Sequence, residues 1–145
     1  MKKYLCHAAG LAVILCSSTV FSATQANEGS GSCPQQVVYN KGSENATISV
    51  SGHAIKLIET GTFNGKKLKT GKSYNFSGVS INKGQLICNY GQSILILNPV
   101  FFQLSPSSSS SSLSFAPGTG QWSTTFFAQH YCPGNASQNC QFTVK

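Results

Sequence analysis

Hydrophobic and polar residues alternate in many short runs after residue 33, and this period of two is typical of strands with one buried face. Residues 46–50 read Ala-Thr-Ile-Ser-Val, and residues 74–77 alternate in the same way. The predicted strands are residues 36–39, 46–50, 53–58, 74–77, 85–90, 93–97, 100–102, 122–131 and 139–144. No window of ten or more residues in this part has a strong helical period. The pattern predicts an all-β fold, a small β-sandwich or barrel.

The first 26 residues have a different pattern, that of a secretory signal peptide. Lys2 and Lys3 precede an apolar centre at residues 11–15, which is too short to span a bilayer. The polar residues that follow at once disfavour a buried N-terminal helix. Lipid attachment at Cys16 is disfavoured because the residue before it, Leu15, is large. We therefore expect this segment to be cleaved and the protein to be secreted or periplasmic, with no transmembrane segment in the mature chain.

The remaining chain is long enough for one domain. Residues 27–32 are predicted to be a flexible leader, and residues 33–145 a single β domain. The clearest change of composition lies at residues 105–120, which include six consecutive serines. Serine competes for backbone hydrogen bonds, so we expect an exposed, flexible, Ser-rich loop; a domain boundary is the alternative. Deleting residues 107–112 from such a loop changes the free energy of unfolding by less than about 1 kcal/mol.

Six cysteines divide between these parts of the chain. Two lie in the signal peptide, and the domain keeps Cys33, Cys88, Cys132 and Cys140. Four cysteines in a short exported chain predict two disulfides, because the compartment is oxidising. We predict Cys132–Cys140, since the Pro-Gly-Asn turn after Cys132 folds the chain back, and Cys33–Cys88 from the remaining pair. The alternative joins Cys88 to Cys140, because each precedes an aromatic residue by two positions.

The domain is basic because acidic residues are scarce. The mature chain keeps eight lysines against Glu28, Glu44 and Glu59, and the whole sequence has no arginine and no aspartate. Nucleic-acid binding is disfavoured, since it relies on arginine for bidentate contacts. Four lysines lie close together in a turn-rich stretch: Lys66, Lys67, Lys69 and Lys72. They are candidate contacts for an anionic envelope polysaccharide, with a merely solvated loop as the alternative.

Groups suited to catalysis are few. A nucleophile or a paired carboxylate needs an acid or base beside it, and no motif surrounds Glu44, Glu59, His53 or His130. The cysteines and histidines also match no zinc-ligand spacing. We therefore expect a non-catalytic protein that binds no metal and no cofactor. A small secreted hydrolase is the less favoured alternative.

Aromatic residues are dense in the last third of the chain. Trp122, Phe127 and Tyr131 are candidate ligand contacts, because exposed aromatic rings can stack on sugars. In a continuous strand over residues 122–131, Phe126 and Phe127 point to opposite faces, so at least one is partly exposed. Packing in a β core is the alternative role for these side chains.

Three short motifs carry a resemblance to known proteins. Cys33-Pro34, Cys88-Asn89-Tyr90 and Cys140-Gln141-Phe142 resemble a family of small exported domains of unknown function from Legionella-type gamma-proteobacteria. The resemblance covers residues 33–145 and implies an exported location and a β fold, but no activity. Together these observations predict a small disulfide-stapled β-sandwich or barrel, exported and non-catalytic, that binds a partner protein or an envelope component. A carbohydrate-binding module is the alternative.

Processing offers the first test. We expect the mature chain to begin near Thr24 or Asn27, because small residues precede both positions. Mass spectrometry of exported material measures this directly, and a chain that still carries Met1 would contradict the prediction.

Overall fold

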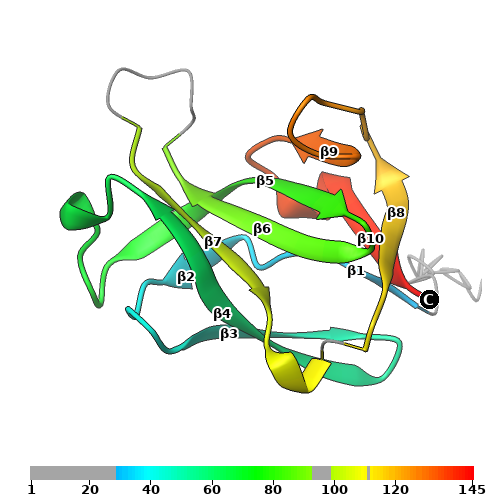
Figure 1. The fold of residues 1–145 in the computed structure, drawn as a ribbon, viewed down its shortest axis with the longest axis horizontal. Helices are drawn as coiled ribbons and strands as arrows, with labels where there is room; N and C mark the ends of the chain where they lie inside the picture. Colours follow the sequence, from blue (N-terminus) through cyan, green and yellow to red (C-terminus); the bar gives the residue numbers. More distant parts are fainter. Residues whose placement is uncertain (1–28, 93–98, 111) are drawn as a thin grey trace, which may run out of the picture.

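The described chain is almost entirely β-structure, and it forms two sheets (Figure 1). This computed structural model describes residues 29–92, 99–110 and 112–145. The strands are β1 (Ser30–Gly31), β2 (Gln36–Val38), β3 (Glu44–Val50), β4 (His53–Phe63), β5 (Ser73–Asn82), β6 (Gln85–Gly91), β7 (Phe101–Pro106), β8 (Phe115–Gly120), β9 (His130–Pro133) and β10 (Cys140–Val144). Three 3-10 turns are η1 (Gly65–Lys67), η2 (Ser108–Ser110) and η3 (Ser137–Asn139). The all-β prediction is confirmed.

The larger sheet curls until its two ends nearly meet. Its strand order is β2-β5-β6-β7-β4-β3, and β9 pairs with the part of β5 that β2 leaves free. The outermost strands β2 and β3 are not paired with each other but follow each other in the chain, so the turn between them connects the two edges of the nearly closed barrel. Two hydrogen bonds join the ends of this turn, from the Asn40 amide to Asn45 Oδ1 (2.7 Å) and from Asn45 Nδ2 to the Asn40 carbonyl (3.1 Å).

Aromatic side chains fill the barrel around Phe102. The rings of Tyr39, Tyr74 and Tyr90 lie 4.9, 5.5 and 5.5 Å from the Phe102 ring, measured between centroids. Phe102 and Tyr90 have no exposed surface. Burial of the Tyr90 hydroxyl is compensated because it donates a hydrogen bond to the Pro34 carbonyl at 3.0 Å.

A second, three-stranded sheet in the order β1-β10-β8 covers one end of the barrel. Its Phe115 and Phe142 are buried and pack edge to face, 5.8 Å apart. Gly31 of β1 lies so close to Val50 of β3 that a Cβ atom there would be 2.4 Å from the valine side chain. Glycine is therefore required where this sheet meets the barrel.

Both predicted disulfides are confirmed. Cys33 is bonded to Cys88, and Cys132 to Cys140. All four cysteines are buried in the core. The alternative that joined Cys88 to Cys140 is wrong, because Cys88 lies on β6 in the barrel whereas Cys140 begins β10 in the second sheet.

The predicted flexible leader at residues 27–32 is wrong for the part that the structure describes. Ser30 and Gly31 form β1, which pairs with Thr143 and Phe142 of β10. The short stretch has no hydrophobic pattern, and its place in a sheet is set by the partner strand. Residues 27 and 28, the signal peptide and the predicted strand at residues 93–97 lie outside the described residues.

The predicted loop at residues 105–120 is also shorter than expected. Its first two residues end β7, and residues 115–120 form β8 despite Pro117. The serine run between them packs on the barrel: the Ser107 amide donates to the Lys56 carbonyl at 2.8 Å, and Ser110 is buried. Deleting residues 107–112 would remove these contacts. We therefore no longer expect the small change in the free energy of unfolding that a free loop would give.

Residues 122–131 form a hairpin rather than one strand. Ser123 pairs with Tyr131, and the chain reverses at Thr125, whose amide donates to the Ala128 carbonyl at 3.0 Å. Phe126 and Phe127 occupy the tip of this turn and are 96% and 88% exposed. The two faces expected from alternation do not exist here, because the turn places both rings outside.

The disulfides are expected to contribute unequally to stability. In the chain-entropy view, the 55-residue separation of Cys33 and Cys88 contributes about 4.2 kcal/mol and the 8-residue separation of Cys132 and Cys140 about 2.6 kcal/mol. Urea unfolding of the two double Cys→Ser variants should therefore show the greater loss for C33S/C88S. A greater loss for C132S/C140S would contradict this ranking.

Burial raises the pKa of Tyr90 well above its usual value near 10. The folded state therefore holds a proton that the unfolded chain releases at high pH, so the stabilisation is complete below about pH 10 and is lost as the pH rises further. Tyr90→Phe should cost about 1 kcal/mol at pH 7, because Pro34 loses its donor. It should also flatten the loss of stability measured by urea unfolding between pH 9 and 11, and an unchanged slope would refute the assignment.

Candidate functional site

The predicted lysine cluster lies around a hollow where β4 leads into β5. Lys67 and Lys72 line this hollow, which has a volume of about 270 Å³. Hydroxyl and amide side chains complete its wall. We call this site the lysine hollow, and its lining side chains are Lys67, Lys72, Ser73, Tyr74, Asn75 and Gln92. Lys66 and Lys69 are exposed on the same short segment but do not line the hollow. The structure therefore brings two of the four predicted lysines together.

Local packing fixes the segment that carries these lysines. Leu68 is buried in the core while its lysine neighbours are exposed. The Gly71 amide donates to the Tyr39 carbonyl, and the Tyr39 amide to the Lys72 carbonyl, both at 2.9 Å. The Lys69 amide donates to the Tyr74 hydroxyl at 3.0 Å. The backbone is held, so the cations project from a defined surface.

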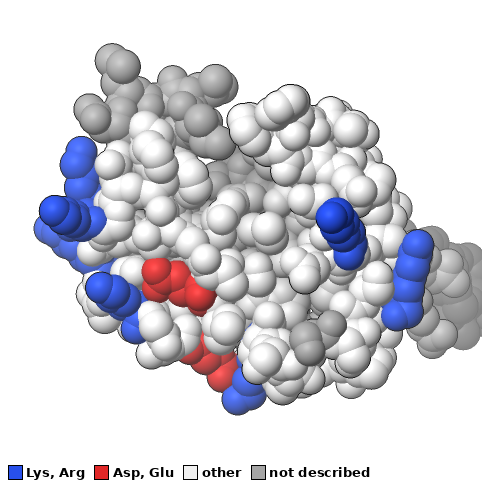
Figure 2. All heavy atoms as spheres, in the orientation of Figure 1, with Lys and Arg blue, Asp and Glu red and all other residues white. Residues whose placement is uncertain are grey.

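Charge is distributed unevenly over the protein. The ion pair found among the described residues joins Lys56 to Glu44 at 2.9 Å. The hydrogen bond from the Thr47 hydroxyl, and to a smaller extent Lys56, lowers the pKa of Glu44. Glu59 accepts a hydrogen bond from the Gly42 amide at 3.2 Å. No described carboxylate therefore pairs with the lysines at the hollow. Figure 2 shows several lysine side chains gathered at one end of the molecule with the acidic side chains near them, and two further basic side chains toward the opposite end.

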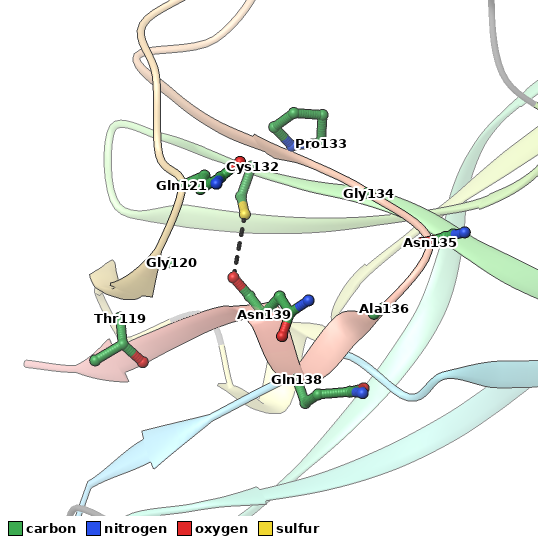
Figure 3. A pocket seen from close by; sticks show the side chains of 10 residues that line it. All are labelled: Thr119, Gly120, Gln121, Cys132, Pro133, Gly134, Asn135, Ala136, Gln138 and Asn139. Carbon is green, nitrogen blue, oxygen red and sulfur yellow. Dashed lines mark hydrogen bonds between the residues drawn. The ribbon is translucent and has the colours of Figure 1, made fainter.

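A larger groove of about 540 Å³ lies at the other end, between the end of β8 and the loop closed by the Cys132–Cys140 disulfide (Figure 3). It is lined by amide side chains, and we call it the amide groove: Gln121, Asn135, Gln138 and Asn139. None of these four amides has a hydrogen-bond partner among the described residues. Amides elsewhere are mostly paired, as Gln36 is with Asn75 and Gln103 with Asn89.

Gln35 fixes the loop that forms one wall of the amide groove. Its side-chain nitrogen donates to the Asn135 carbonyl, and its side-chain oxygen accepts from the Ser137 amide at 2.8 Å. The sulfur of Cys132 lies 3.6 Å from the Asn139 carbonyl (Figure 3). A disulfide sulfur has no proton to give, so this approach is a packing contact and not a hydrogen bond.

The three predicted aromatic contacts do not form one platform. Trp122 is half-buried, and its Nε1 donates to the Gln141 carbonyl at 3.2 Å. Tyr131 is also half-buried, against Gly78 of β5, and burial raises the pKa of its hydroxyl. Phe127 alone is exposed, and its ring packs edge to face on Phe126, 5.3 Å away. Trp122 and Tyr131 thus support the hairpin whose tip presents Phe127.

The titratable groups considered for catalysis are dispersed. His53 and His130 are exposed, and neither lines the lysine hollow or the amide groove. Glu44 and Glu59 make the contacts described above and are likewise absent from both linings. Over the described part of the chain, no three histidine, cysteine or acidic residues are grouped as metal ligands would be.

The sequence interpretation missed the groove amides and Phe126. Isolated Gln and Asn residues have no recognisable spacing, so only the fold shows that they converge. One signal was present in the sequence: residues 84–144 contain no lysine, arginine, aspartate or glutamate. This segment without lysine, arginine or carboxylate supplies the amide groove and the hairpin.

A scan of protein-family models found no match, and neither did searches of curated proteins and of solved structures. The resemblance to small exported bacterial domains therefore stays a prediction. Within the described ranges there is no helix with the length and apolarity needed to cross a membrane.

Proposed function

We propose that this is an exported, non-catalytic protein that attaches to an anionic polymer of the cell envelope through the lysine hollow. The observation that carries the proposal is the placement of Lys67 and Lys72 in one hollow with hydroxyl and amide groups and no carboxylate. Anionic groups would find two cations and several hydrogen-bond donors there. An anionic partner protein is the competing occupant, and the test below distinguishes it.

The type of cation also supports a polymer. Lysine is a flexible point charge without the rigid bidentate geometry of arginine, so it suits repeated carboxylate, phosphate or sulfate groups whose exact positions vary. Lys66 and Lys69 on the same segment extend the positive surface beyond the hollow. A chain of regularly spaced anions can contact all four lysines, whereas one small anion cannot.

Export is supported by the two disulfides, since such bonds persist in oxidising compartments. The dispersal of His53, His130, Glu44 and Glu59 favours binding over catalysis. Neither the lysine hollow nor the amide groove contains an acid and a base that could act together.

Charge reversal tests the lysine hollow. We expect the mature protein to be retained by dextran sulfate or polygalacturonate in affinity electrophoresis at low salt, and not by uncharged dextran. K67E/K72E should weaken this retention about tenfold or more, because two attractions become repulsions. Raising the salt toward 1 M should weaken it as well, since surface charges are then screened.

The matched control is K83E/K145E, which changes the net charge equally but leaves the hollow intact. Its retention should stay close to that of the parent protein. Equal losses in both double variants would show that only net charge matters, and retention indifferent to salt would also refute the proposal. Retention by neither polyanion, with capture of an acidic protein instead, would favour the competing occupant.

A further inference from the structure

We propose that the amide groove is a second binding site, and that it takes a neutral glycan chain. The inference is independent of the lysine hollow, because no lysine lines the groove. It rests on three observations: the unpaired amides, the absence of charged residues from the groove lining, and the exposed aromatic tip of the hairpin that follows Gln121.

The groove has the size and chemistry of a ligand site. Its volume of about 540 Å³ lies within the range usual for small-molecule sites. Gln121 comes from one wall, and Asn135, Gln138 and Asn139 come from the disulfide-closed loop opposite (Figure 3). Each amide offers both donors and an acceptor, which matches the hydroxyl groups of a sugar, since these also donate and accept.

The uncharged lining selects the class of ligand. A charged ligand would lose water in the groove without meeting an opposite charge, and an apolar ligand would leave the amides unsatisfied. Residues 84–144 supply every residue that lines the groove and contain no lysine, arginine or carboxylate. A neutral, hydroxyl-rich molecule is therefore the class of ligand that this lining favours.

The hairpin at residues 122–131 extends the site. Its two arms begin directly at the groove, one after Gln121 and the other before Cys132. Phe126 is five residues from Gln121, at most about 18 Å along the chain, so a glycan of several sugar units can span both. The two exposed rings of Phe126 and Phe127 offer apolar faces on which the C–H face of a sugar can pack.

The frame of the site is held before any ligand arrives. The Cys132–Cys140 disulfide closes the loop, and Gln35 holds that loop by hydrogen bonds to Asn135 and Ser137. β9 continues from the hairpin and pairs with β5, with Cys132 opposite Val79. Little backbone ordering is then needed on binding, which favours affinity.

The experiment presents the mature protein to an array of neutral glycans that contains glucans, mannans, galactans, xylans and chitin fragments. We expect retention of at least one of them, with little dependence on salt. Q121A/Q138A should weaken binding to that glycan about tenfold, because two hydrogen-bonding amides are lost. F126A/F127A should weaken it about fivefold. All four side chains are exposed, so the fold should survive, as circular dichroism can verify.

Two control variants distinguish this site from the others. K67E/K72E should bind the neutral glycan as the parent does, even if it loses polyanion binding, so the two proposals fail separately. F63A removes another exposed phenylalanine, on β4 and outside the groove lining, and should also bind normally. Retention of no neutral glycan on the array would overturn the inference, as would retention that survives both Q121A/Q138A and F126A/F127A.

Discussion

Three consecutive residues, Cys33, Pro34 and Gln35, tie the separate parts of this fold together. Cys33 is bonded to Cys88 of β6, and the Pro34 carbonyl accepts from the buried Tyr90 hydroxyl. The Gln35 carbonyl accepts from the Phe76 amide of β5, while its side chain holds the loop before η3. A backbone segment without regular structure thus joins the barrel strands, the aromatic core and the amide groove.

The anchored barrel separates two chemically different surfaces. Strand β5 reaches both: Tyr74 near its start lines the lysine hollow, and Val79 pairs with Cys132 of the amide groove. Five residues of strand place these two positions about 17 Å apart. Cations gather at the first surface, and the second is formed by an uncharged stretch of chain. Under the two proposals, the anionic and the neutral polymer would bind at separate places and so would not compete.

Much of the fold could be predicted from sequence because β-strands with one buried face have a period of two. Ala46 to Val50 alternates and forms part of β3, and the Pro-Gly-Asn turn after Cys132 gave the correct disulfide. β1 and β8 were missed because pairing with β10, and not local pattern, makes them strands. The amide groove was missed for a related reason: its residues converge only when the disulfide and Gln35 bring distant segments together.

The central claim is that two independent sites occupy opposite parts of one rigid frame. NMR titration of a single ¹⁵N-labelled sample tests it most directly, first with a neutral oligosaccharide retained on the array and then with dextran sulfate. The account predicts two separate sets of shifted backbone amides. The neutral ligand should shift those around Gln121, Asn135 and Gln138, and the anion those around Lys67 and Lys72. Shifts of one common set by both ligands would contradict the account.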